Sequence, residues 1–436
     1  MRASWKKNKS LKPKVILEKI DSLKKVVDGK VTFSSFEYHD AKAALESMIN
    51  FPNAAKDLDK SLLVTNAIWD VAKAPVTEAK AFIDQINQNI RDELATREST
   101  YFVLTSISVT NIGIRTLRLD DCVFRFYQSR FPTKFNNRKS LILSKRNVEE
   151  TESFGYTKVV IELSAKSEQL AAKKGLRVLD QLRAMYCLFL NSSNEFIGNQ
   201  WEPINRVRLG EYHTVHREDG TIYPDMFWYD PTYKYARPAS SDHISIIVKN
   251  IKYVISRLGK LDRKYKDTLI ESLLRYVRAF DEQNQNTAVM RAWGALECVA
   301  APSESNCDSV TRRCAFLFEE HEYHKQILEH VREYRNRNVH AGEESKAAKN
   351  HGFQIQRYFK QLWLFHIHNV GNFDEILDAN RFLDLPTSKV SLLDNQKIIK
   401  KALKFRGYVA CSGQLKLATV LEFSQYNRSD SLGVRP

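Results

Sequence analysis

The sequence predicts a mainly α-helical chain with an α+β region in its middle and an antiparallel helical bundle toward its C-terminus. Stretches rich in β-branched and aromatic residues occur between residues 101 and 238, which indicates strands. From residue 243 to about 384, apolar residues recur at helical spacing and the connections are short, which is typical of antiparallel neighbours. We therefore expect a mostly helical region at 1–100, an α+β region at 101–245, a helical domain at 246–385 and a tail of unclear structure at 386–436.

Length, charge and cysteine usage narrow the class of protein. The 436 residues suffice for two or three domains, because single cores stop growing near ~250–300 residues. A formal net charge of +15 without a long apolar segment predicts a polyanionic partner, nucleic acid before a membrane. The six cysteines are scattered, with no CxxC pair, and no apolar signal segment is evident. These features favour reduced thiols in a cytoplasmic protein.

The N-terminal region begins with a strongly basic segment. Residues 1–30 contain ten lysines and arginines against three acidic residues. We interpret this segment as a solvated helical arm, and the alternative is an arm that binds the RNA backbone. Residues 39–95 follow a mainly helical pattern, clearest at 76–94, where Phe82 and Ile86 share one face. We expect this part to pack rather than to catalyse.

Strands and one long helix are predicted in the middle region. Residues 101–110, 116–127 and 156–163 are β-rich and are expected to form one sheet. Residues 167–190 have an apolar stripe at helical spacing. The stretch 201–238 is rich in Pro, Gly, Tyr and His, which predicts further strands and loops. This combination is typical of an α+β domain.

A segment between two of these strands interleaves cations with aromatic rings. Residues 124–135 read Phe-Arg-Phe-Tyr-Gln-Ser-Arg-Phe-Pro-Thr-Lys-Phe, and further cations follow up to residue 146. Cations track phosphates and rings stack on bases in single-stranded nucleic acid, whereas the alternative is that alternating aromatics form core. We expect the loop 128–146 to recognise the substrate or a trigger. The candidate RNA-binding residues are Arg125, Arg130, Lys134, Arg138, Lys139, Lys145 and Arg146.

The C-terminal bundle is expected to be built from successive short-linked helices. Apolar periodicity predicts helices at 244–258, 267–282, 287–301, 309–319, 322–340, 353–370 and 373–382, and a possible helix at 396–404. Neither Gly nor Pro interrupts 322–340, and Gly342 follows it as a stop signal.

The helix expected at 322–340 carries the residues on which the functional interpretation rests. Asn336 and His340 lie four apart, so both project from one face, with Arg335 beside them. His340 falls in the last turn, where exposed carbonyls and the helix dipole favour a cationic imidazole. A cationic histidine next to an arginine suits a phosphodiester.

The pattern Arg335-Asn336-x-x-x-His340, late on a helix and followed by Ala-Gly, resembles the signature of the HEPN superfamily and, within it, of the Apea-like HEPN domains. Residues 292–297, Ala-Trp-Gly-Ala-Leu-Glu, resemble the Trp-x-Ala-Leu-Glu turn of an earlier helix in that group. The similarity covers about residues 267–384. It implies a HEPN-type bundle and, by analogy alone, a toxin-like effector of antiviral defence that halts phage-infected cells, as in abortive infection.

For an RNA substrate, the motif offers chemistry that requires no metal. RNA carries its own nucleophile, the 2′-hydroxyl, so cleavage needs a base, an acid for the 5′-oxygen and positive charge for the phosphorane. His340 can act as base or acid, Arg335 as the charge clamp and Asn336 as an orienting partner. The resemblance implies a composite site between two domains, hence a homodimer, a 2′,3′-cyclic phosphate product and no cofactor. Supporting roles are assigned to Glu297, Tyr334, Arg337 and Asn338.

The expected partners are RNA, a second copy of the chain and a phage-derived or nucleotide trigger, with no membrane. The main alternative is a non-catalytic HEPN module that binds RNA or a nucleotide on behalf of another effector. Glu297 faces inward by periodicity and is expected to pair with Arg335 or Arg337, either as a structural ion pair or in catalysis.

Other candidate sites are weaker. Cys307, Cys314, His321 and His324 lack the tightly spaced pairs of structural zinc sites. His213 and His216 near Asp219 have no third ligand in register, so we interpret them as part of a polar loop. No Walker loop, G-x-G-x-x-G, G-x-S-x-G or H-E-x-x-H pattern occurs, which leaves an NTPase, a dinucleotide enzyme, a serine hydrolase or a zincin without support.

Overall fold

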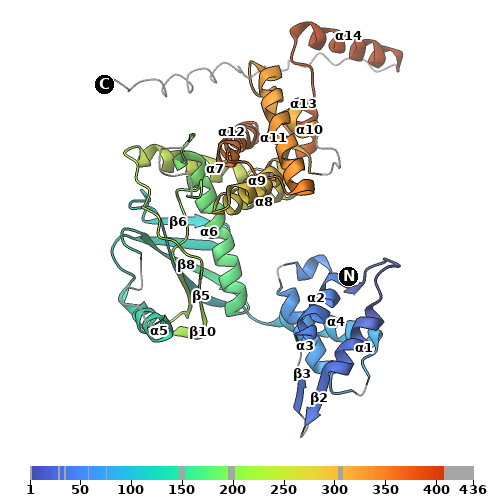
Figure 1. Ribbon diagram of the computed structural model, residues 1–436, viewed down its shortest axis with the longest axis vertical. Helices are drawn as coiled ribbons and strands as arrows, with labels where there is room; N and C mark the ends of the chain where they lie inside the picture. Colours follow the sequence, from blue (N-terminus) through green and yellow to red (C-terminus); the bar gives the residue numbers. More distant parts are fainter. Residues whose placement is uncertain are drawn as a thin grey trace.

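The computed structural model describes residues 2–27, 30–33, 36–56, 58–74, 76–146, 153–194, 202–302 and 308–406 (Figure 1). It confirms a mainly helical chain with a sheet-containing middle region. Over these ranges, no helix combines the length and apolar character needed to cross a lipid bilayer. Cys307, Cys411 and residues 407–436 lie outside the described residues. The cysteines within them, Cys122, Cys187, Cys298 and Cys314, are free thiols.

The N-terminal region is a helical unit with a core of its own. Leu17, Leu45, Val64 and Phe82 meet in this core. The solvated arm expected at 1–30 is wrong for its helical part, because Leu17 and Ile20 are buried. Its elements are α1 (Pro13–Leu23), α2 (Glu37–Met48), α3 (Lys60–Val71) and α4 (Ala79–Ala95), with short antiparallel ladders of β1 (Ser4–Trp5) on β4 (Ile49–Asn50) and β2 (Lys24–Val27) on β3 (Lys30–Phe33).

The middle region contains a six-stranded antiparallel sheet, as the β-rich stretches predict. The strand order is β10-β9-β5-β8-β7-β6. The central strand β5 pairs with β8 along its whole length and with β9 on its other side. The strands are β5 (Ser99–Ile107), β6 (Thr116–Leu119), β7 (Cys122–Tyr127), β8 (Thr157–Ala165), β9 (Tyr212–Arg217) and β10 (Ile222–Tyr229).

Helix α6 (Glu168–Leu190) covers one face of this sheet. Val103, Ile161 and Leu179 belong to the core between them. A β-carbon at Gly175 would lie only 3.1 Å from Val103 Cγ2, so the glycine permits the close approach of helix and strand. Figure 1 shows α6 continuing from the sheet into the helical bundle.

The opposite face of the sheet is covered by the segment that was expected to be a loop at 128–146. This segment contains a short 3-10 helix (Thr133–Phe135) and α5 (Asn137–Arg146). Phe135 packs with Phe102, Leu104 and Val160 of the sheet, and Ile142 is fully buried. The loop prediction is therefore wrong from residue 133 onward, because apolar residues hidden among the cations anchor the segment.

The C-terminal helices occur where periodicity predicts them, with ends shifted by a few residues. Helix α9 lies at their centre and packs against α8, α10, α11 and α12. The helices are α7 (Ile244–Leu258), α8 (Arg263–Phe280), α9 (Gln285–Ala300), α10 (Asp308–Phe316), α11 (His321–Ala341), α12 (Ala348–His368), α13 (Ile376–Leu383) and α14 (Lys389–Phe405). The last of these extends the helix expected at 396–404, and none of its residues is buried.

The expected boundary between the α+β region and the bundle, near residue 245, does not divide the core. A single hydrophobic cluster joins sheet residues such as Val103 and Phe124 to bundle residues such as Leu273, Trp293 and Trp363. Helix α6 packs on β5 and β8 and also on α8. The middle and C-terminal regions are thus one packed unit, which apolar periodicity along the chain cannot reveal.

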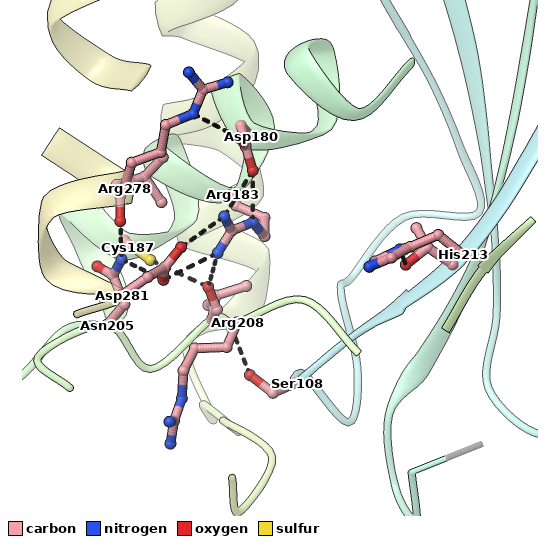
Figure 2. A network of polar contacts seen from close by, with 12 residues as sticks. Ser108, Asp180, Arg183, Cys187, Asn205, Arg208, His213, Arg278 and Asp281 are labelled. Carbon is pink, nitrogen blue, oxygen red and sulfur yellow. Dashed lines mark hydrogen bonds and ion pairs between the residues drawn. The ribbon is translucent and has the colours of Figure 1, made fainter. Parts of the chain in front are cut away.

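A buried ion network lies where α6 meets the bundle (Figure 2). Arg183 is 1% exposed, and its Nη2 donates to Asp180 Oδ1 at 2.6 Å and to Asp281 Oδ2 at 3.0 Å. Its Nη1 donates to the carbonyl oxygen of Val207 at 3.0 Å. Burial alone would lower the pKa of Arg183, but the Asp281 and Asp180 carboxylates raise it above its ordinary value. The guanidinium therefore stays charged inside the core.

Amide side chains extend this network across the bundle. Asn205 Nδ2 donates to Asp281 Oδ1 at 2.8 Å. Asn191 Nδ2 in turn lies 3.1 Å from Asn205 Oδ1 and 2.8 Å from Gln356 Oε1 of α12. A continuous set of hydrogen bonds thus ties α6, α8 and α12 together.

Replacing Arg183 by Met should lower the free energy of unfolding by about 3–5 kcal/mol, because the buried Asp180 and the half-buried Asp281 lose their shared cation. Urea unfolding followed by circular dichroism measures the change. Arg177→Met on the same helix is the matched control, since Arg177 is 49% exposed and should contribute less than ~0.5 kcal/mol. Equal effects of the two substitutions would contradict the structural role of the network.

A second ion network fastens α10 to the end of α13. Arg313 donates to both Asp384 oxygens at 2.8 and 2.6 Å, and Arg312 donates to Oδ1 at 2.7 Å. Partial burial raises the pKa of Asp384, but the hydrogen bonds from Arg313 and Arg312 outweigh it and hold the pKa below its ordinary value.

Replacing Asp384 by Asn should destabilise the protein at neutral pH by about 1–3 kcal/mol. The folded pKa is lowered, so the contribution is fully present above the unfolded pKa of ~3.9 and is lost as the pH falls through the folded pKa. Urea midpoints of wild type and variant should therefore converge in acid. Asp378→Asn, which disturbs only a pair with Arg381 on the same helix, is the control. A variant gap that stays constant down to strongly acidic pH would contradict the linkage.

Candidate active site at the end of helix α11

Helix α11 carries the motif and ends where the sequence predicts. Gly342 has a φ of 65°, in the left-handed region, and its N–H donates to the carbonyl oxygen of Asn338 at 3.0 Å. This geometry closes the last turn and is easy only for glycine among common residues. Residues 335–340 therefore occupy regular helical turns, so their expected spacing on the helix surface holds.

Arg335 turns toward α9 and is held there. Its Nη2 lies 3.5 Å from Glu297 Oε1, and its Nη1 donates to Asn336 Oδ1 at 3.1 Å. The same Glu297 oxygen accepts a hydrogen bond of 2.9 Å from the indole N–H of Trp293, whose side chain is fully buried. The predicted pairing of Glu297 with Arg335 is confirmed, and a line of polar contacts connects the core to the guanidinium.

Asn336 and His340 lie toward the outer face of α11. Asn336 is half-buried and His340 is exposed. In the part of the chain that the structure describes, the His340 imidazole makes no hydrogen bond or ion pair, and none joins it to Arg335. Successive helical residues are ~100° apart, which places Arg335 on the flank toward α9. The three side chains are thus neighbours, but within one copy they do not converge on one point.

Polar contacts hold the last turn of α11 and the chain that follows. Asn286 Oδ1, at the start of α9, accepts from the Tyr334 hydroxyl and, at 3.0 Å, from the Ser345 backbone N–H. Arg337 Nε lies 3.1 Å from Glu343 Oε2, and Asn338 Nδ2 donates to the carbonyl oxygen of Glu343. Tyr334, Arg337 and Asn338 thus support the helix end. The sequence argument missed Asn286, because one asparagine in a first helical turn has no distinctive pattern.

Most of the candidate RNA-binding cations are engaged within the protein. Arg138 is buried and donates to Thr214 Oγ1 and to the carbonyl oxygen of Tyr212, both at 3.0 Å, so its assignment to direct RNA contact is wrong. Arg125 pairs with Glu162. Two further cations lie over rings of the sheet: Lys134 lies 3.8 Å from the centroid of the buried Phe102, and Arg146 lies 3.8 Å from that of Tyr229.

Arg130, Lys134, Lys139 and Lys145 remain exposed, and RNA contact by these residues stays a prediction. Figure 1 places α5 at the end of the sheet away from the bundle, whereas α11 lies in the bundle. The basic segment and the motif therefore do not form one site within a single copy.

The histidines of β9 are structural rather than metal-binding. His213 and His216 are three apart on a strand, so they point to opposite faces, and the predicted polar loop is wrong. His216 Nδ1 donates to the carbonyl oxygen of Gly220 at 2.9 Å, while His213 Nδ1 lies 2.8 Å from Thr105 Oγ1. Burial lowers the pKa of His213 to about 3 and that of His216 to about 4, so both are neutral at neutral pH.

No group of three or more potential metal-ligating side chains comes together within the described ranges. Cys314, one of the four residues weighed as zinc ligands, is buried, and burial raises the pKa of its thiol to about 12, so it is protonated at neutral pH.

No protein-family model, curated protein or solved structure matches the chain. The expected HEPN relationship therefore rests on the motif residues and on the turn at 292–297, and it stays a prediction.

Replacing Tyr334 by Phe should lower the free energy of unfolding by about 1 kcal/mol, because the ring keeps its packing while the hydroxyl contact to Asn286 is lost. The Ser345 amide should exchange its hydrogen faster, since Asn286 would be held less firmly. Tyr323→Phe is the control, because the Tyr323 side chain is exposed on the same helix. Unchanged exchange at Ser345 would contradict the supporting role of Tyr334.

Proposed function

We propose that this chain is a metal-independent endoribonuclease that cleaves RNA through the 2′-hydroxyl at a composite site between two HEPN-type domains. One observation carries the proposal. Arg335 is positioned by Glu297 and Asn336, while His340, on the same helix end, is exposed and without a partner among the described residues. A positioned guanidinium can stabilise phosphorane charge, and an available imidazole can move protons.

A second copy would complete the chemistry. Cleavage needs both a base for the 2′-hydroxyl and an acid for the 5′-oxygen. The next histidine back along α11, His330, lies ten residues from His340, which is ~15 Å along the helix axis. The outer face of α11, with Asn336, exposed Val339 and His340, is the surface on which a second motif would dock. By the resemblance alone, we further propose a toxin-like role in cytoplasmic antiphage defence.

The ion pair of Arg335 bears on both the catalytic proposal and the alternative of a non-catalytic RNA- or nucleotide-binding module. Arg335 already has a carboxylate partner in Glu297, and this ion pair competes with a phosphate for the guanidinium. In the catalytic proposal, the Glu297 carboxylate orients Arg335, and the remaining N–H groups of the Arg335 guanidinium face the substrate.

The central test is RNA cleavage in EDTA by the purified full chain. Arg335→Ala and His340→Ala should each slow cleavage at least ~100-fold, the usual scale for losing proton transfer or charge stabilisation. Arg381→Ala and His330→Ala are matched controls on exposed positions of the bundle and should cleave as wild type. The new ends should carry a 2′,3′-cyclic phosphate, and a single 2′-deoxynucleotide should block cleavage at its own position.

Several outcomes would contradict this proposal. Cleavage that persists in both active-site variants, or that requires a divalent cation, would exclude the mechanism. An active monomer in sedimentation velocity would contradict the composite site. RNA binding that is lost in Arg335→Ala, without cleavage by wild type of any RNA tested, would favour the binding module.

A further inference from the structure

Helix α14 leaves its apolar side chains open to solvent. None of its residues is buried, and Figure 1 shows it projecting beyond α13. Ile398 is 63% exposed and Phe405 is 87% exposed, while Leu392, Ile399 and Leu403 are exposed as well. Keeping a contiguous set of large apolar side chains in water is unfavourable. The exposure therefore points to a partner for this face.

The two faces of α14 differ in chemistry. With ~100° between successive residues, Leu392, Ile399 and Leu403 fall on one side, and Ile398, Ala402 and Phe405 adjoin them. Five lysines lie around the rest of the helix: Lys389, Lys397, Lys400, Lys401 and Lys404. Asp394 is the one acidic residue, so the formal charge of the helix is 5 − 1 = +4. The helix is therefore amphipathic and basic.

We propose that α14 binds an anionic lipid surface and lies along it. Its apolar side would enter the boundary between head groups and acyl chains, and its lysines would reach the lipid phosphates. No membrane-spanning helix is needed for this mode. The sequence argument expected no membrane partner because it considered only spanning and signal segments, so it did not address a helix that lies in the interface.

Charge and apolarity together favour this occupant over two others. RNA would attract the lysines but would leave Ile399, Leu403 and Phe405 without an apolar environment. A second copy could cover the apolar side through its own α14, but this would bring two helices of +4 side by side, which is locally repulsive. An anionic bilayer matches both sides at once.

Vesicle co-sedimentation of the full chain tests the proposal. The protein should sediment with vesicles of phosphatidylcholine mixed with phosphatidylglycerol, but much less with phosphatidylcholine alone, and added salt should weaken binding. A Phe405→Trp variant should show a blue shift of its added tryptophan emission on anionic vesicles, relative to wild type. These readouts do not depend on ribonuclease activity, so the proposal can fail or hold independently of it.

Matched variants separate the two faces. The double substitution Ile399→Asn and Leu403→Asn should weaken vesicle binding ~10-fold or more, because two apolar side chains that would enter the bilayer are lost. Val390→Asn, which lies among the lysines, should have little effect. Lys400→Gln with Lys404→Gln should also weaken binding ~10-fold or more, given the attraction per lysine near an anionic surface. Lys80→Gln with Lys260→Gln, which lie on exposed positions elsewhere, should bind as wild type.

The proposal is overturned if wild type does not bind anionic vesicles, or if the Ile399 and Leu403 substitutions leave binding unchanged. Loss of RNA affinity in the Lys400 and Lys404 variant, with no vesicle binding by wild type, would assign the basic side to nucleic acid and also overturn it. Because α14 buries none of its residues, all variants should keep the wild-type circular dichroism and unfolding temperature, which excludes misfolding as a cause.

Discussion

The buried charge of Arg183 is the constraint on which the rest of the structure depends. A guanidinium cannot shed its proton inside a protein, so its burial requires carboxylates at fixed positions. Asp180 supplies one from α6, and Asp281 supplies the other just past the end of α8. The earlier turns of α6 lie on the sheet at Gly175, so moving the bundle away from this helix would take Asp281 from Arg183 and Arg278 from Asp180. Such a loss costs several kcal/mol, which explains why the middle and C-terminal regions share one core.

The contacts that lead from this junction to the motif helix hold Arg335 but not His340. Helix α8 packs on α9, and the buried Trp293 of α9 orients Glu297, which in turn holds Arg335. Helix α11 itself buries only Leu328, Val331 and Tyr334. The arginine is therefore tied to the core, while His340 lies where the helix is held by polar contacts near its end. In the proposed mechanism, this arrangement of a held cation and an exposed imidazole is incomplete for cleavage, and a second motif over the helix end would complete it.

The bundle helices and strands β5 to β8 were predictable from the sequence because each repeats a pattern along the chain, whereas α5, β9 and the β2–β3 ladder were not. The motif helix with its stop at Gly342 followed from helical periodicity in the same way. Periodicity left Glu297 two candidate partners, Arg335 and Arg337, and the structure shows the pair with Arg335. Contacts between distant segments were not predictable. Nothing local shows that Arg138 pairs with the backbone of Tyr212, that α5 covers a sheet face, or that Asn286 fastens Tyr334. For the same reason the sequence did not show that one core spans residue 245: periodicity indicates which residues face inward, but not which other segment they contact.

The net charge of +15 does not show by itself which surface of the protein carries the available cations. The sequence pattern places its effect at residues 125–146, where cations and rings alternate. There, Arg125 pairs with Glu162, Arg138 is buried on neutral acceptors, and Arg146 lies over a ring. Part of that charge is therefore engaged within the protein, whereas Arg130, Lys134, Lys139 and Lys145 are exposed. The lysines of α14 are solvent-exposed, and they stand beside apolar side chains that are also exposed. A nucleic acid could account for the lysines alone, whereas a lipid surface accounts for both. Under the two proposals, the end of α11 would meet a phosphodiester and α14 an anionic interface, so the two anionic partners would bind separate surfaces rather than one continuous RNA-binding face.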